Sequence, residues 1–158
     1  MRLEDEIRQT RPFDSPAQAA HLSIARTAAV LEHALEAALK PHGITGTQYN
    51  VLRILRGAGS EGLCRREVTE RMIRPVPDAT RLLDRMEAAG LIERERSGAD
   101  RRFVSTRLTP KGRAMVDRLD APIRALHERH FGGIATKALG ALVEVLARVR
   151  AGVDPEAT

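Results

Sequence analysis

The chain has 158 residues, a size typical of one domain, and 42% of them are apolar, which is enough for a packed core. Aromatic residues make up only 3% and tryptophan is absent, so aliphatic side chains must form the core, which favours a mostly helical fold. The net charge of +5 predicts attraction to polyanions.

Cysteine usage and hydropathy bear on where the protein works. The single cysteine, Cys64, excludes an internal disulfide and agrees with a reducing compartment. The first 13 residues alternate in charge and lack the apolar centre of a signal peptide. No later run reaches the roughly 18 apolar residues of a membrane span. We therefore expect a cytoplasmic protein without a membrane segment.

The positive charge is concentrated in residues 64–113. This segment holds 13 Arg and Lys against 8 Asp and Glu, while the rest of the chain holds 13 of each. No Ser/His/Asp spacing, phosphate loop or paired-carboxylate motif accompanies it, so we expect neither an enzyme nor a cofactor. The segment instead indicates binding to nucleic acid.

The N-terminal part predicts one long helix. Residues 1–13 are expected to form a flexible arm or a short extra helix. Ser15 as N-cap and Pro16 at the first helical position then start a helix within residues 14–40. Because so long a helix has a broad apolar stripe, we expect it to pack against a second subunit. The stripe consists of Ile24, Ala28, Leu31, Leu35 and Leu39.

A second helix is predicted over residues 46–56. Thr45 and Gln48 have the spacing of a capping box, and Ile44 and Tyr49 that of a hydrophobic staple. Residues 57–62 read as a loop. The side chains expected in the core are Val51, Leu52 and Leu55.

Two short helices follow, over residues 65–73 and 77–89. Two prolines in the joint between them forbid one continuous helix, and Pro77 suits a first helical position with Asp78 beside it. Gly90 is placed to end the second helix. The pattern is a helix-turn-helix whose second helix buries Ala79, Leu82, Leu83 and Met86.

The remaining elements predict a wing and two helices. Strands over 91–96 and 103–108 flank a turn at 97–102. A helix over 111–131 buries Met115, Leu119, Ile123 and Leu126, and Pro122 is expected to kink or divide it. A last helix over 136–150 is expected to bury Leu139, Leu142, Val143, Leu146 and Val149, and residues 151–158 to form a disordered tail.

The order of these elements, the wing motif Asp100-Arg101-Arg102, the run at 80–92 and the Leu-Thr-Pro-Lys-Gly motif at 108–112 together resemble the MarR family of bacterial transcription regulators. The resemblance spans about residues 22–149. It implies a winged helix-turn-helix lobe at 44–113, with dimerisation helices at 14–40 and 110–150.

The resemblance also implies how such a protein works. It implies a homodimer in which each protomer presents one winged helix-turn-helix to a pseudo-palindromic operator in double-stranded DNA. Many members of the family bind a small ligand between the two lobes and then lose affinity for DNA. We therefore expect a repressor that a small-molecule effector relieves.

The start of the second short helix holds the expected base readers. Thr80 and Arg81 stand where such helices read the major groove, and an arginine can bridge two acceptors on guanine. The family often has small hydroxyl residues just before this point, whereas this chain has Pro77 and Asp78. The carboxylate of Asp78 either repels phosphate or accepts from a cytosine amino group.

Arg85 lies one turn beyond Arg81, and the sequence leaves its role open. It either contacts DNA or pairs with a nearby acid, such as Asp84 or Asp100. At the start of the preceding helix, Arg65 and Arg66 are expected to contact phosphate, the alternative being simple solvation.

In the wing, Arg101 is expected to enter the minor groove, whose negative potential attracts guanidinium groups. Arg102 is expected to contact phosphate or to brace the turn, and the choice between the two arginines stays open. The alternative is a solvated basic loop.

Three other functions compete with this hypothesis. Cys64 near a helix start could act as a redox switch, although a small structural residue explains it as well. His127 and His130 share one helical face, but a third ligand at a suitable spacing is missing, so no metal is expected. Finally, a winged helix can bind another protein.

Overall fold

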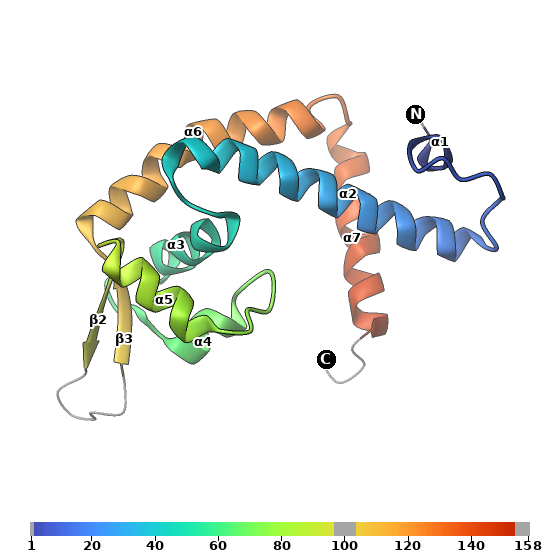
Figure 1. Ribbon diagram of the computed structural model, residues 1–158. Coiled ribbons are helices and arrows are strands. Elements are labelled where there is room, and N and C mark those ends of the chain that lie inside the picture. The colour runs from blue at the N-terminus through green and yellow to red at the C-terminus, as the bar shows by residue number, and fades with distance from the viewer. Residues whose placement is uncertain (1, 97–103, 154–158) are drawn as a thin grey trace. The chain divides into compact units, whose positions relative to one another are not determined.

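The computed structural model describes residues 2–96 and 104–153 (Figure 1). It divides into two compact units, residues 1–120 and residues 121–158. Most of the described chain is helical, with one small antiparallel sheet in the first unit, as the sequence predicts. None of the described helices is both long enough and apolar enough to cross a membrane.

The first unit begins with a short helix and a long one. Helix α1 spans Leu3–Glu6, which matches the second of the two expectations for residues 1–13. Helix α2 spans Pro16–Leu39, and the Ser15 hydroxyl accepts a bond of 3.1 Å from the Gln18 amide, so the predicted start is confirmed. Arg26 of α2 pairs with Glu6, with its Nε 3.4 Å from the carboxylate.

Helix α3 spans Gly46–Ala58 and follows a single 3-10 turn, η1, at Lys40–His42. Its capping box is confirmed: the Thr45 hydroxyl accepts from the Gln48 amide at 3.2 Å, and the Gln48 side chain accepts from the Thr45 amide at 2.9 Å. Ile44 and Tyr49 are both buried, as a hydrophobic staple requires. The helix runs two residues further than predicted.

The sheet has three strands in the order β1-β3-β2. Strands β2 (Ile92–Arg96) and β3 (Val104–Leu108) form the predicted hairpin, with Ile92 opposite Leu108. Strand β1 (Leu63–Cys64) pairs with β3 through Leu63 and Thr106, which the sequence does not predict. Two residues are too few to show an alternating pattern, and their partner lies more than 40 residues away.

The helix-turn-helix consists of α4 (Arg65–Glu70) and α5 (Ala79–Ala88), both shorter than predicted. Beyond α4, the Ile73 amide donates to the Asn50 side chain at 3.0 Å instead of to a helical carbonyl.

Pro77 is not the first helical residue, so that prediction is wrong. Asp78 is the N-cap of α5: its carboxylate accepts from the Arg81 amide at 2.9 Å, and its backbone angles (φ −131°, ψ 76°) lie outside the helical region. A capping side chain requires such a conformation, so the helix begins after it.

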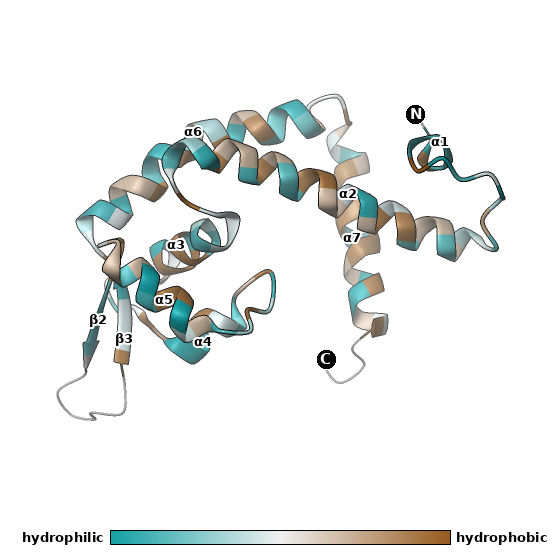
Figure 2. Cartoon of the chain, viewed as in Figure 1, coloured by the Kyte–Doolittle hydropathy of each residue, from teal (hydrophilic) through white to brown (hydrophobic). Residues whose placement is uncertain are grey.

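The helices of this unit enclose an aliphatic core. Apolar side chains on one side of α3, α4, α5 and the first part of α6 are almost completely buried. Figure 2 shows polar residues on the outer side of α5. Each such side chain contributes about 1.5 to 3 kcal/mol on burial. The core includes the predicted Val51, Leu52, Leu55, Leu82, Leu83, Met86, Met115 and Leu119, together with Val68 and Val116.

Helix α6 (Pro110–Phe131) crosses the boundary between the two units. Its start is capped by Thr109, whose hydroxyl accepts from the Gly112 amide at 3.0 Å. Ile123 and Leu126 are buried as predicted. Pro122 lies inside the helix without dividing it, so of the two expected outcomes, a kink or a division, the division does not occur.

Helix α7 (Thr136–Val153) forms the rest of the second unit. The predicted burial of its apolar side chains is wrong for the single chain: Leu142, Val143 and Val149 are 46%, 64% and 47% exposed. The helical pattern itself is present, and Leu139 and Leu146 of that face are half-buried among the described residues. The helix also continues through residues 151–153, which the sequence assigns to the tail; residues 154–158 lie outside the described part.

Close packing at Gly112 generates a stability prediction. A Cβ added there would lie 1.9 Å from the Leu91 carbonyl oxygen, which belongs to the backbone and cannot move aside cheaply. We expect Gly112→Ala to destabilise the protein by at least about 3 kcal/mol in urea unfolding. Gly57→Ala is the control, because that helical position has open space and should gain about 0.5 kcal/mol. Equal stability of the two variants would contradict the packing described.

Candidate nucleic-acid interface

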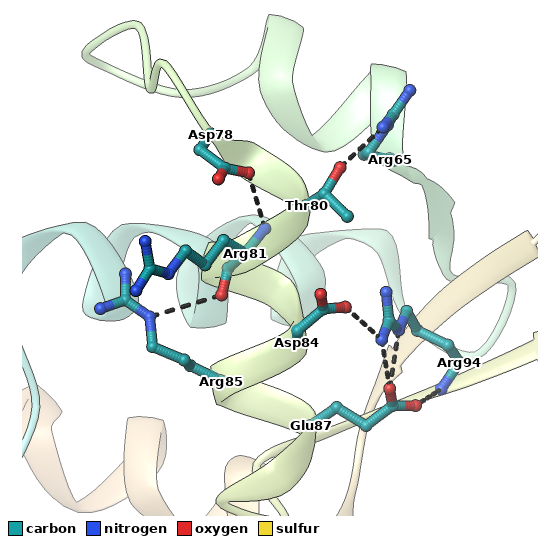
Figure 3. Close-up of polar contacts among 8 residues, drawn as sticks. All are labelled: Arg65, Asp78, Thr80, Arg81, Asp84, Arg85, Glu87 and Arg94. Atoms are coloured by element: carbon teal, nitrogen blue, oxygen red, sulfur yellow. Dashed lines mark hydrogen bonds and ion pairs between the residues drawn. The ribbon is translucent and has the colours of Figure 1, made fainter.

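Helix α5 has one buried face and one charged, exposed face. Leu82, Leu83 and Met86 hold it against the core, while Thr80, Arg81, Asp84 and Arg85 lie on the outer side. Figure 3 shows the Arg81 and Arg85 guanidinium groups on one side of the helix and Asp84 and Glu87 toward the other. The helix therefore offers a basic strip to a partner.

The starts of α4 and α5 meet at this surface. The Arg65 guanidinium donates to the Thr80 hydroxyl at 2.7 Å, so these two predicted residues are in direct contact. An open cavity of about 450 Å³ lies between the two helix starts. Five of the residues predicted from the sequence line it: Arg65, Arg66, Pro77, Asp78 and Thr80.

Arg81 and Arg85 make few contacts within the protein; of the two acids that the sequence offers as partners of Arg85, Asp84 and Asp100, the second lies outside the described residues. The Arg85 Nε donates to the Arg81 carbonyl oxygen at 3.4 Å, the outer limit of a hydrogen bond. It does not pair with Asp84, because Asp84 is bound by Arg94 instead. Within residues 2–96 and 104–153, no side chain accepts a hydrogen bond from the Arg81 guanidinium. Both arginines thus keep most of their donors available.

Arg66 forms an exposed ion pair with Glu70 one turn later, with 2.6 Å between Nε and the carboxylate oxygen. The hydrogen bond to Glu70 raises the pKa of Arg66 above its ordinary value. Because solvent surrounds both groups, a phosphate can replace Glu70 at little cost.

Arg94 of β2 is not among the site residues predicted from the sequence, yet it makes the densest polar contact on α5. Its Nε donates to Glu87 at 2.8 Å and its Nη2 to Asp84 at 2.6 Å, while its backbone amide donates to Glu87 at 3.1 Å (Figure 3). The hydrogen bond to Glu87 is the main cause of its raised pKa. A signal existed: Arg94 lies two residues after buried Ile92, and alternation places both on one strand face.

The C-terminal end of α5 is fixed by Gly90 and by the Leu-Thr-Pro-Lys-Gly motif. Gly90 adopts φ +69°, and the amides of Gly90 and Leu91 donate back to the last turn at 2.8 and 3.0 Å. The Thr109 hydroxyl donates to the Gly90 carbonyl and the Lys111 ammonium to the Ala89 carbonyl, both at 2.7 Å. The motif thus caps α5 and joins it to α6, a role that the sequence did not reveal.

The other candidates are the wing residues, one cysteine and two histidines. Arg101, Arg102 and Asp100 fall outside the described residues. Cys64 is half-buried and precedes α4, where its amide donates to the Glu67 carboxylate at 2.7 Å. Around His127 and His130, as elsewhere in the described part of the chain, no cluster of three or more metal-ligating side chains occurs.

Several known proteins are similar to this chain in both sequence and fold. Residues 42–102 match the sequence model of the MarR family. The chain is 30% identical over 118 residues to a Bacillus subtilis protein named as the uncharacterized HTH-type transcriptional regulator YkoM, and the match covers 74% of each of the two chains. AbsC, a MarR family regulator from Streptomyces coelicolor, has a TM-score of 0.79 and 26% identity, covering 93% of this chain and all of its own.

A mutant of MarR from E. coli, solved in complex with operator DNA, has a TM-score of 0.72 and 25% identity, with coverage of 80% of this chain and 89% of that one. Taken with the winged helix-turn-helix geometry, these similarities define a transcription regulator and not an enzyme. The chain belongs to the MarR family.

The cap at the start of α4 generates a prediction about pH. The bond from the Cys64 amide lowers the pKa of Glu67 below its ordinary value of 4.5, so folding favours the charged form. The stabilisation is therefore present above that value and disappears as the pH falls through the lowered folded pKa. We expect Glu67→Gln to be less stable than the native protein at neutral pH, with a difference that shrinks between about pH 5 and pH 3.

Urea unfolding at several pH values measures this difference. Glu93→Gln, which changes an exposed carboxylate of β2, is the control. A difference between Glu67→Gln and the native protein that stays constant with pH would rule out the charged cap.

Proposed function

We propose that the protein is a homodimeric repressor that reads a pseudo-palindromic operator in double-stranded DNA and releases it when a small molecule binds. The exposed basic strip of α5 carries this proposal. An α-helix fits the major groove, and two arginines with available donors on its exposed side would face base edges there. The complex of the E. coli homologue with operator DNA supports the same partner for this chain.

Each site residue receives a role from its surroundings. Arg81 reads bases, and Arg85 reaches a base edge or a phosphate one turn further. Thr80 already accepts from Arg65, so its own hydroxyl hydrogen is free to donate to a base acceptor.

The residues before α5 have mixed roles. Asp78 uses one carboxylate oxygen as the helix cap, which leaves the other for a cytosine amino group, while Pro77 shapes the turn. Arg65 and Arg66 neutralise phosphate, since neither is buried. For the wing we propose that Arg101 enters the minor groove and that Arg102 binds phosphate or braces the turn.

The exposed apolar side chains of α2 and α7 support a homodimer. Ile24 and Val30 of α2 are 40% and 47% exposed, and α7 has no buried residue in the single chain. Burying such faces against a second copy removes apolar surface from water. We therefore assign residues 14–40 and 110–150 to dimerisation and residues 44–113 to DNA binding.

Homologues support repression relieved by a ligand. Rv2887 of Mycobacterium tuberculosis, 33% identical over 104 residues, is named a transcriptional repressor. CouR from Rhodococcus jostii, 25% identical with a TM-score of 0.70, was solved bound to p-coumaroyl-CoA. In this chain the effector must have a higher affinity for the form that cannot bind DNA than for the form that can. Equal affinity for both forms would shift no equilibrium.

Selection of bound sites from random duplex DNA at physiological salt tests the proposal. We expect an inverted repeat whose half-sites lie one helical turn, or a multiple of it, apart. A single asymmetric half-site would contradict the homodimer. No enrichment at all would reject sequence-specific regulation and favour a winged helix that binds protein.

Two substitutions separate base reading from charge. Arg81→Ala should relax base preference and cost about 1 to 3 kcal/mol on the selected site, with little change on scrambled DNA. Arg101→Ala should weaken binding to both and lower the salt slope by about one charge. Filter binding or anisotropy at several salt concentrations gives both quantities, and an unchanged slope in Arg101→Ala would exclude the wing contact.

A further inference from the structure

Two carboxylates lie on the helix that we place in the DNA groove. Asp84 and Glu87 of α5 have side chains that are 52% and 38% exposed. Negative charges at a DNA surface repel phosphate and oppose the release of counterions. A helix that carries them needs a compensating cation to bind DNA well.

Arg94 is positioned as that cation. It lies on β2, and its guanidinium donates to both Glu87 and Asp84, while its backbone amide adds a further bond to Glu87. Its side chain is only 26% exposed, so it is less accessible to a partner than either acid. Its Nε and Nη2 already donate to the two acids, whereas Arg85 gives up only its Nε to the Arg81 carbonyl at the outer limit of a hydrogen bond.

We propose that Arg94 is a positioning residue for DNA recognition: it neutralises Asp84 and Glu87 and ties α5 to β2, without touching DNA itself. The charges that α5 presents to DNA are then those of Arg81 and Arg85. The proposal rests on the DNA-binding function proposed above and adds to it a residue that acts through the recognition helix.

The rival explanation is that Arg94 contacts phosphate directly. The two explanations predict different results when the acids are removed. A direct contact with phosphate contributes to binding whether or not Asp84 and Glu87 are charged, whereas neutralisation contributes only when they are. The same substitution, Arg94→Met, is therefore made in two backgrounds: the native chain and Asp84→Asn/Glu87→Gln. Dissociation constants are measured on the duplex selected by the native protein and on a scrambled duplex.

In the native background we expect Arg94→Met to weaken binding to the selected duplex by about tenfold or more, because two carboxylates lose their partner. In the acid-free background the same substitution should change binding by less than about threefold. Equal losses in both backgrounds would overturn the proposal in favour of a direct contact, and no loss in either would remove Arg94 from DNA recognition altogether.

Arg56→Met is the matched control for stability. Arg56 also bridges two carboxylates of one helix, Asp117 and Asp120 of α6, and its side chain is 27% exposed, close to the value for Arg94. We expect it to lower thermal stability while DNA affinity stays within about threefold of native. If Arg56→Met weakens DNA binding as much as Arg94→Met, the effect is general destabilisation and the proposal fails.

Two further readouts complete the test. If Arg94→Met does not fold by circular dichroism, Arg94→Lys replaces it in both backgrounds; it keeps one positive charge but loses the fork, so the loss should again be larger in the native background. If the native protein does not prefer the selected duplex over the scrambled one, the proposed function fails. If the native protein prefers the selected duplex but Arg94→Met weakens binding equally in the two backgrounds, only the proposed role of Arg94 is wrong.

Discussion

The structure depends on how the last turn of α5 is held. Gly90 turns the chain with a positive φ, Thr109 and Lys111 bind the carbonyls that the helix leaves open, and Gly112 lets the start of α6 approach the Leu91 carbonyl. A recognition helix reads bases only if its position is fixed to a fraction of an ångström. The same contacts join α5 to α6, which continues into the second unit.

The position of α5 also determines which of its charged side chains are paired within the protein. Arg94 pairs with Asp84 and Glu87, and Asp78 uses part of its carboxylate to cap the helix. The charged groups of α5 that stay largely unpaired are therefore the guanidinium groups of Arg81 and Arg85. Overall charge does not describe this arrangement, since the segment 64–113 contains many acids among its arginines. In the proposed complex with DNA, recognition then depends on which arginines are paired within the protein.

Local signals in the sequence predict local structure well. The caps at Ser15 and Thr45 and the buried strip of α5 follow from spacing alone, and the structure confirms them. Pairings distant in sequence leave no such signal, as with β1 and β3, Arg94 and Asp84, and the cap on α5 from Lys111. The predicted start of α5 is misplaced because proline suits a first helical position, while the capping preference of Asp78 prevails. The apolar face of α7 is correct as a pattern, but most of its side chains stay exposed in the described chain.

The most direct test of the account is methylation interference on a selected binding site. If α5 reads the major groove, methylation of guanine N7 should block binding in two symmetric clusters one helical turn, or a multiple of it, apart, and Arg81→Ala should lose that sensitivity. Interference spread evenly along the duplex, or clusters that are unaffected by Arg81→Ala, would contradict it.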